Sequence, residues 1–234
     1  MTDERSLTRP VYDEKQLVSS YDDRRFGGVG GAYVLERELD LVTEFLGPTS
    51  GPVLDVPCGT GLLRSRLDQA GYSTIAADAS ARMLEVTRRR SADPVVRCDA
   101  FSLPFEADSV DASCTLRLFQ HYPADAIERL LGELRRVVTP SGRIVFDTFR
   151  WSPRNTPLFD GGVYTYSDAE VDAILARVGL EPIATESAFV VTPILYRKCP
   201  GSVVSVLDAA DRLIPDRALV RTFWCCTPRR EVRR

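Results

Sequence analysis

Apolar and polar positions follow two periods along this chain, one typical of strands and one typical of helices. From residue 52 onward, short apolar runs alternate with longer stretches in which apolar residues recur every three or four positions. The short runs predict strands at 52–56, 72–77, 95–98, 110–116 and 143–149, and the longer stretches predict helices at 61–70, at 80–90 and after Pro123. Alternating units of this kind predict a doubly wound parallel sheet with right-handed crossovers.

The two ends of the chain depart from this alternation. Residues 1–50 predict a helical lead-in, with a glycine-rich interruption at 27–31 and a second helix at 33–46. After residue 150 the pattern predicts a loop at 151–162, a helix at 168–178 and two closing strands near 182–191 and 221–227, with an amphipathic helix between them. So short a return between the closing strands predicts an antiparallel edge hairpin.

The expected fold is therefore α/β and Rossmann-like, with a mostly parallel, seven-stranded, doubly wound sheet and helices on both faces. We expect residues 1–50 to form a lid and residues 51–234 to form the main domain. Insertions at about 150–166 and 194–219 are expected to cover a substrate.

Composition and charge argue against several classes of function. The chain has 234 residues and a net charge of −3, which gives no overall attraction to nucleic acid or to an anionic membrane. The polar N-terminus and the lack of a long apolar run argue against a signal peptide and a membrane span. The six cysteines lack CxxC spacing and His121 is the only histidine, so no metal site is expected. We therefore expect a cytoplasmic protein.

Acidic residues stand at the ends of three successive predicted strands. Asp55 ends the first strand and precedes Gly59 and Gly61, whose lack of a Cβ lets a ligand approach the backbone. Asp78 ends the second strand, where a carboxylate accepts hydrogen bonds from two ribose hydroxyls. Asp99 ends the third strand, where it can accept from an exocyclic amine such as adenine N6. One strand-end acid is commonly only a turn residue. Three on one sheet edge indicate an adenosine-like ligand.

Four segments carry a resemblance to a known family: DVPCGTG, AADASARML, CDAFSLPFEADSVDAS and LRRVVTPSGRIVF. In this order they resemble the class I S-adenosylmethionine-dependent methyltransferases, in particular the small-molecule "methyltransferase type 11" group. The resemblance covers about residues 50–150. Two positions depart from the family pattern, since Pro57 replaces the first glycine of the turn and Pro140-Ser141-Gly142 replaces Pro-Gly-Gly.

The resemblance implies S-adenosylmethionine as the cofactor. It implies that Asp55, Gly59 and Gly61 hold the methionine part, Asp78 the ribose, and Asp99 with Ala100 the adenine. Leu116 and Arg117 are implied to lie near the methionine and the sulfonium. The cofactor-binding set it implies is completed by Pro57, Thr60 and Ala79.

Three residues are candidates for catalysis. His121 follows the fourth strand and titrates near neutrality, so it is a candidate base, although a capping or supporting imidazole is the alternative. Asp147 lies near the active end of the fifth strand, where an ionisable group needs a partner or a function. Tyr21 belongs to the lead-in that folds over the cofactor in the family, unless it only packs a helix on the core.

The leading hypothesis is methyl transfer from S-adenosylmethionine to a small or medium organic acceptor. A nucleic-acid methyltransferase is disfavoured because the segment after the fourth strand lacks a motif for holding a flipped base, and no basic stripe accompanies it. An NAD-dependent oxidoreductase needs G-x-G-x-x-G, which residues 57–64 do not provide. A cofactor-binding protein that contacts a partner or a membrane surface through its 203–214 helix stays open, as does a monomer or homodimer.

Overall fold

The structure is a computed structural model that describes residues 18, 20–90, 94–151 and 163–229. Seven strands form one sheet in the order β3-β2-β1-β4-β5-β7-β6. The strands are β1 (Val53–Asp55), β2 (Thr74–Asp78), β3 (Val95–Arg97), β4 (Val110–Thr115), β5 (Val138–Phe149), β6 (Leu180–Ala188) and β7 (Arg221–Pro228). The first five are parallel to their neighbours, and β7 runs antiparallel between β5 and β6. The predicted fold class and edge hairpin are confirmed.

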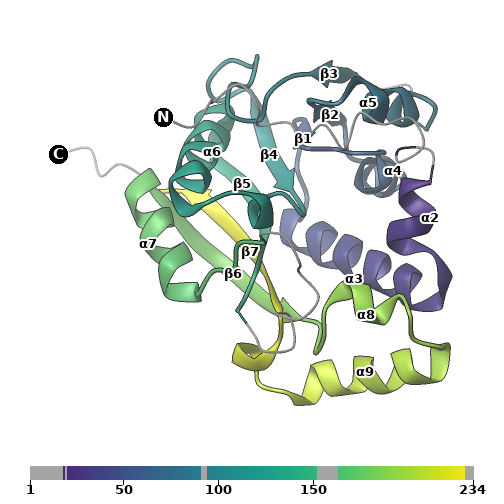
Figure 1. Cartoon of the computed structure of the whole chain (residues 1–234). Coiled ribbons are helices and arrows are strands. Elements are labelled where there is room, and N and C mark those ends of the chain that lie inside the picture. The colour runs from purple at the N-terminus through teal and green to yellow at the C-terminus, as the bar shows by residue number, and fades with distance from the viewer. Residues whose placement is uncertain (1–17, 19, 91–93, 152–162, 230–234) are drawn as a thin grey trace.

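Helices cover both faces of the sheet, as Figure 1 shows. On one face, α6 (Ala124–Val137) and α7 (Asp168–Val178) bury Leu130 and Ile174 against the sheet. The other face is covered mainly by α3 (Gly28–Leu46) and α4 (Leu62–Gln69), with α5 (Ala81–Arg88) beside β2 and β3. The sheet is therefore the middle of three layers, and its side chains alternate between two apolar cores.

Local sequence rules set the ends of several helices. Ser167 caps α7 by accepting from the Glu170 backbone N–H, while the Glu170 side chain accepts from the Ser167 backbone N–H. This reciprocal pair satisfies two N–H groups that the helix itself leaves open. Gly179 ends α7 in the left-handed conformation, with a φ of 71°. Helix α7 accordingly begins and ends where the sequence predicts.

The glycine-rich segment 27–31 differs from its prediction. A break exists only at Gly27, between α2 (Tyr21–Phe26) and α3, and α3 begins at Gly28 and continues through Gly30 and Gly31. A Cβ at Gly30 would lie 1.8 Å from the Tyr196 carbonyl oxygen. A Cβ at Gly31 would lie 2.4 Å from the Phe26 carbonyl carbon. These glycines permit close packing inside a helix, so they do not form the flexible interruption that the sequence suggested.

The fifth strand begins earlier than the predicted residue 143. Residues 139–142 belong to β5, which begins at Val138, and the register between β4 and β5 shifts between Val110 and Ala112. A Cβ at Gly142 would lie 2.4 Å from the Asp111 carbonyl oxygen. The Pro-Ser-Gly sequence is therefore accommodated by a register shift within one strand.

The segment between β6 and β7 folds into two helices, α8 (Pro193–Tyr196) and α9 (Gly201–Leu213), followed by the short helix η5 (Asp216–Ala218). Both α8 and α9 lie beyond α3 at one corner of the molecule (Figure 1). Asp211 of α9 accepts hydrogen bonds from the backbone N–H groups of Phe189 and Val190 and from the Tyr196 hydroxyl. Within the described residues, none of the helices is both long enough and apolar enough to cross a membrane.

Candidate ligand site at the carboxyl edge of the sheet

The turn after β1 presents an open backbone at the carboxyl edge of the sheet. Gly59 has a φ of 54°, and a Cβ added there would meet nothing within 4 Å. Gly61 has a φ of 80° and precedes α4, and a Cβ there would lie 2.9 Å from the Thr87 side chain. Gly61 is thus needed for packing against α5, whereas Gly59 faces free space. The open side of this turn is where the sequence places a ligand.

Asp55 ends β1 as a buried carboxyl group, with an exposed fraction of 2%. Its Oδ2 atom has no hydrogen-bond partner among the described residues. Burial raises the pKa of Asp55 from its ordinary value of 3.8 to about 8, with the Asp78 charge adding to the effect and the Arg117 charge opposing it. A buried oxygen without a partner is costly in a finished site. Among the described residues, Asp55 Oδ2 is therefore left open to a hydrogen-bond partner from a ligand.

The acids at the ends of β2 and β3 support backbone turns at the same edge. Asp78 accepts from the Gly59 backbone N–H at 2.9 Å and from the Ser80 N–H at 2.8 Å. Asp99 is exposed, and its Oδ1 accepts from the Phe101 N–H at 2.9 Å. Each carboxylate keeps acceptor capacity beyond these bonds. The structure thus brings Asp55, Asp78 and Asp99 to one edge in the order that the sequence predicts.

Next to Asp99, an apolar loop is held in place by α6. Arg136 donates to the carbonyl oxygens of Leu103 and Phe105, at 3.0 and 2.8 Å. Glu133 accepts from the Leu103 backbone N–H and pairs with Arg136. Leu103 is buried and Phe105 is half-buried. This arrangement fixes a loop with apolar side chains beside Asp99.

The other residues of the predicted cofactor set lie in the same region. Thr60 is buried in the glycine turn, Pro57 is half-buried just before it, and Ala79 follows Asp78. Ala100 is half-buried beside Asp99, and Leu116 is buried after β4. Their roles toward a cofactor stay predictions.

A network of four charged side chains lies behind this edge. Asp147 in β5 accepts from the Arg117 backbone N–H and from Arg221 Nε, both at 2.6 Å. Glu38 in α3 pairs with the guanidinium groups of both Arg117 and Arg221. Glu38 and Arg221 are each 1% exposed as side chains. Two acids and two bases thus neutralise one another in a site that excludes water.

The network changes the interpretation of Asp147. The sequence made it a candidate for catalysis, but both of its oxygens are engaged by Arg117 and Arg221 and its exposed fraction is 2%. Arg117 has a φ of 58°, an unusual value for a residue with a side chain. The bond from its N–H to Asp147 stabilises this conformation. Asp147 therefore holds the segment after β4 and does not face the open edge.

His121 ends the short helix η3 (Phe119–His121) and is half-buried. Its Nε2 lies 3.4 Å from the Gln120 side-chain nitrogen. Tyr21 is half-buried in α2. The catalytic roles of His121 and Tyr21 stay predictions.

Helix α2 is attached directly to the glycine turn. The Thr60 hydroxyl donates to Asp22 Oδ1 at 2.6 Å, and Arg90 pairs with the same carboxylate. Arg90 also donates to the Thr60 carbonyl oxygen at 2.9 Å. The lead-in therefore contacts the loop implied to hold the cofactor, through three residues far apart in the sequence.

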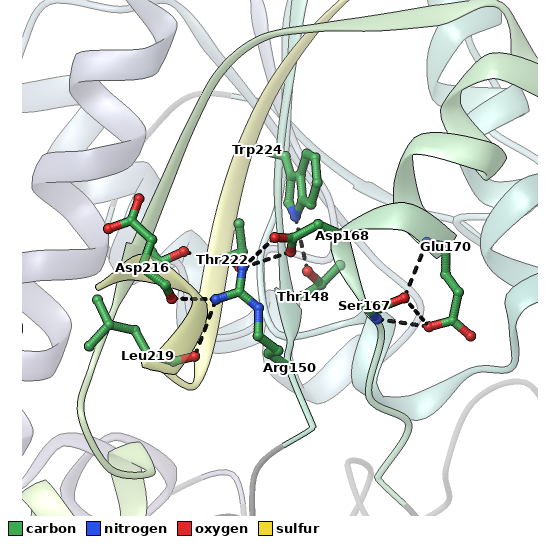
Figure 2. A network of polar contacts seen from close by, with 10 residues as sticks. Thr148, Arg150, Ser167, Asp168, Glu170, Asp216, Leu219, Thr222 and Trp224 are labelled. Carbon is green, nitrogen blue, oxygen red and sulfur yellow. Dashed lines mark hydrogen bonds and ion pairs between the residues drawn. The ribbon is translucent and has the colours of Figure 1, made fainter. Parts of the chain in front are cut away.

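A second polar cluster lies on the face of the sheet that α7 covers only in part (Figure 2). Arg150 makes two hydrogen bonds of 2.7 Å to Asp168 and also donates to the Asp216 and Leu219 carbonyl oxygens. Trp224 Nε1 donates to the Thr148 hydroxyl at 2.9 Å. Arg150, Asp168, Asp216 and Trp224 border a cleft of about 430 Å³. Arg150 thereby fastens the start of α7 to the segment before β7.

Sequence patterns did not indicate three residues of these attachments: Asp22, Arg90 and Arg221. Each lies outside the motifs, and its partner is distant in the chain. Glu38 was indicated only in that it interrupts the apolar face of the helix at 33–46. Among the described residues, the cysteines are free thiols and no group of three acidic, histidine or cysteine side chains is arranged to bind a metal.

Comparison with known proteins shows what this geometry resembles. Residues 54–146 match a family model described as "Methyltransferase domain". This segment contains the glycine turn, Asp78, Asp99 and the Arg117 segment. With its seven-stranded sheet, the chain is similar to the class I S-adenosylmethionine-dependent methyltransferases.

Curated relatives match part of the chain. The demethylmenaquinone methyltransferase of Clavibacter sepedonicus is 38% identical over 154 residues, which are 62% of this chain and 59% of that protein. The malonyl-[acyl-carrier protein] O-methyltransferase of Pectobacterium atrosepticum is 40% identical over 130 residues, covering 53% and 51%. The chain thus spans between half and three fifths of the length of these relatives.

Solved structures match more of the chain at lower identity. The magnesium protoporphyrin IX methyltransferase of Synechocystis, with bound S-adenosylhomocysteine, aligns with a TM-score of 0.65 and 15% identity over 94% of this chain and 97% of that one. The geranyl diphosphate C-methyltransferase of Streptomyces coelicolor aligns with a TM-score of 0.65 and 16% identity over 94% and 89%. These likenesses show the fold.

Proposed function

We propose that this chain binds S-adenosylmethionine and transfers its methyl group to a small organic acceptor. The observation that carries the proposal is the buried Asp55 oxygen without a partner, beside the open backbone of Gly59. An ammonium donor, such as that of the methionine part, would satisfy this oxygen. Asp78 and Asp99, on the neighbouring strands, supply acceptors for a ribose and an adenine amine.

Each part of the site contributes a distinct physical effect to this function. S-adenosylmethionine supplies a methyl group on a sulfonium, whose leaving group is a neutral thioether. The protein's task is then to align the acceptor and to exclude water. Glycine at position 59 lets the ligand approach the backbone, and the Arg136-bound loop fixes an apolar wall. Asp147 and Arg117 fix the end of β4 beside this wall.

A base is needed only if the acceptor carries a proton that it must lose. His121 is our candidate for this role because it follows β4 at the carboxyl edge and its imidazole can titrate near neutrality. Tyr21 is proposed to lie over the site as part of the lead-in, which α2 attaches to the glycine turn.

The acceptor is proposed to be a small molecule. The net charge of −3 gives no attraction to nucleic acid, and the two curated relatives are named for a demethylated quinone and a malonyl group on a carrier protein. Screening candidate metabolites for release of S-adenosylhomocysteine tests the acceptor class. Turnover with a nucleic acid and with none of the metabolites would contradict it.

Calorimetric titration with S-adenosylmethionine, S-adenosylhomocysteine and NAD tests the proposed cofactor. We expect binding of the first two and none of NAD. Tight binding of NAD without S-adenosylmethionine would overturn the proposal. Binding of S-adenosylmethionine with no transfer to any acceptor would favour a cofactor-binding protein that acts through a partner.

The ribose assignment predicts the effect of Asp78→Ala. The variant loses the ribose acceptor and also the bonds to the Gly59 and Ser80 N–H groups, so we expect cofactor affinity to fall at least about tenfold, the effect of losing one charged hydrogen bond. Calorimetric titration with S-adenosylhomocysteine measures this change in affinity. Asp111→Ala is the matched control, since Asp111 accepts from the Gly51 N–H at the opposite sheet edge. Equal affinity in Asp78→Ala and the wild type would refute the assignment.

A further inference from the structure

Two arginines, one half-buried and one buried, lie behind the part of the site assigned to the methionine end of the cofactor. Arg117 follows β4 by two residues, and its side chain is 18% exposed. Arg221 begins β7, and its side chain is 1% exposed. The charge of Arg117 acts on the Asp55 carboxyl at the end of the neighbouring strand β1. Without acidic partners, these guanidinium groups would add two positive charges behind the edge.

Aromatic rings lie over both guanidinium groups and, with their burial, reduce their contact with water. The Phe26 ring lies 4.8 Å from the Arg117 guanidinium carbon. The rings of Phe149 and Phe223 lie 5.3 and 4.8 Å from that of Arg221. Water and salt therefore screen these charges weakly, so neutralisation must come from protein acids.

Glu38 is the acid that both arginines share. Its Oε2 pairs with Arg117 and its Oε1 with Arg221, whereas Asp147 contacts only the backbone of Arg117 and the side chain of Arg221. Arg25 of α2 also acts on Glu38 electrostatically. Removing the Glu38 charge would thus leave the Arg117 side chain without an ion pair to any acid among the described residues.

We propose that Glu38 is a positioning residue that keeps the sulfonium end of the site free of excess positive charge by neutralising Arg117 and Arg221. This inference rests on the proposed function. S-adenosylmethionine carries a positive sulfonium, and S-adenosylhomocysteine carries a neutral thioether at the same place. A charge effect therefore changes the affinity for the first ligand more than that for the second, whereas a loss of shape changes both.

The test is the ratio of the two dissociation constants, measured by calorimetry on the full chain. In Glu38→Gln the edge gains a positive charge, and we expect affinity for S-adenosylmethionine to fall about tenfold more than affinity for S-adenosylhomocysteine. The control is Glu36→Gln on the same helix, whose carboxylate pairs only with Arg66 at 3.2 Å and is 57% exposed. The control should leave the ratio unchanged.

A second variant predicts a shift of the opposite sign. Arg221→Gln removes a positive charge and leaves Glu38 and Asp147 in excess, so the ratio should move in favour of S-adenosylmethionine. The double variant Glu38→Gln/Arg221→Gln should return the ratio to that of the wild type. Glu38→Asp keeps the negative charge, so its ratio should stay close to that of the wild type. If Glu38→Gln alone does not fold, these variants still test the proposed charge effect.

The outcomes separate the two levels of the proposal. If the wild type binds neither ligand, the proposed function fails and this inference falls with it. If the wild type binds both, but Glu38→Gln and Arg221→Gln leave the ratio unchanged or shift it in the same direction, the proposed function stands and Glu38 is only a structural residue.

Discussion

Asp55 is a buried acid whose ionisation the fold opposes. Its pKa of about 8 lies above the ordinary 3.8, because burial disfavours the charged form. In the unfolded chain Asp55 loses its proton near pH 4, and in the folded chain near pH 8. Its contribution to stability is therefore complete below about pH 4 and is lost as the pH rises toward 8.

Asp55→Asn removes this titration and keeps the shape of the side chain. We expect the ligand-free variant to be more stable than the wild type by about 1–3 kcal/mol at pH 8.5, with little difference at pH 4. Thermal unfolding across this pH range measures the effect. Parallel stability curves for the two proteins would show that Asp55 does not titrate between these values.

The same variant separates stability from binding. An asparagine oxygen still accepts a hydrogen bond but carries no charge for an ammonium group. Asp55→Asn should therefore bind S-adenosylhomocysteine more weakly even where it unfolds at a higher temperature. A gain in both properties would remove Asp55 from the cofactor site.

At the scale of elements, the contact between α3 and α8 depends on a missing side chain. Gly30→Ala would place a Cβ 1.8 Å from the Tyr196 carbonyl oxygen, so the two helices must separate. We expect a loss of about 1–3 kcal/mol in the free energy of unfolding. Gly132→Ala in α6 is the control, because a Cβ there meets nothing within 4 Å. It should stabilise the protein by about 0.4–1 kcal/mol. Denaturant unfolding compares the two, and equal stabilities would contradict this account of Gly30.

Elements whose signals are local were predictable from the sequence. The capping pair of Ser167 and Glu170 lies within one turn, and α7 begins and ends as expected. The glycines of α3 were misread because the atom that requires glycine at position 30 belongs to Tyr196. Composition shows a glycine but does not show whether its purpose is flexibility or close contact.

In the candidate site, too, the features with local sequence signals were predictable and the long-range contacts were not. Asp55, Asp78 and Asp99 stand at strand ends, a position that a sequence pattern reports, and the structure brings them to one edge. Asp147 was recognised as an acid in need of a partner, but its partner Arg221 lies 74 residues later, on the antiparallel neighbour β7. Because the members of the ion network are far apart in the sequence, no local pattern indicates it. The position of Asp147 was therefore predictable, and its orientation was not.

At the scale of the whole molecule, the lead-in and the main domain meet at the glycine turn. Asp22→Ala breaks the contacts of α2 with Thr60 and Arg90. We expect faster amide hydrogen exchange in residues 20–31 and in the turn, with a change of only about 0.5–1 kcal/mol in overall stability, since the pair is partly exposed. Asp23→Ala, an exposed neighbour on the same helix, is the control. Identical exchange in the two variants would show that α2 is held by apolar packing alone.

The place of Arg221 has a consequence for how the molecule is made. Strand β7 is the last strand in the sequence, yet it lies inside the sheet between β5 and β6. Glu38 and Asp147 leave the ribosome much earlier and share a cation that arrives only with β7. A growing chain without Arg221 lacks the cation that joins these two carboxylates. We therefore expect the ion network behind the ligand edge to be completed late in biosynthesis.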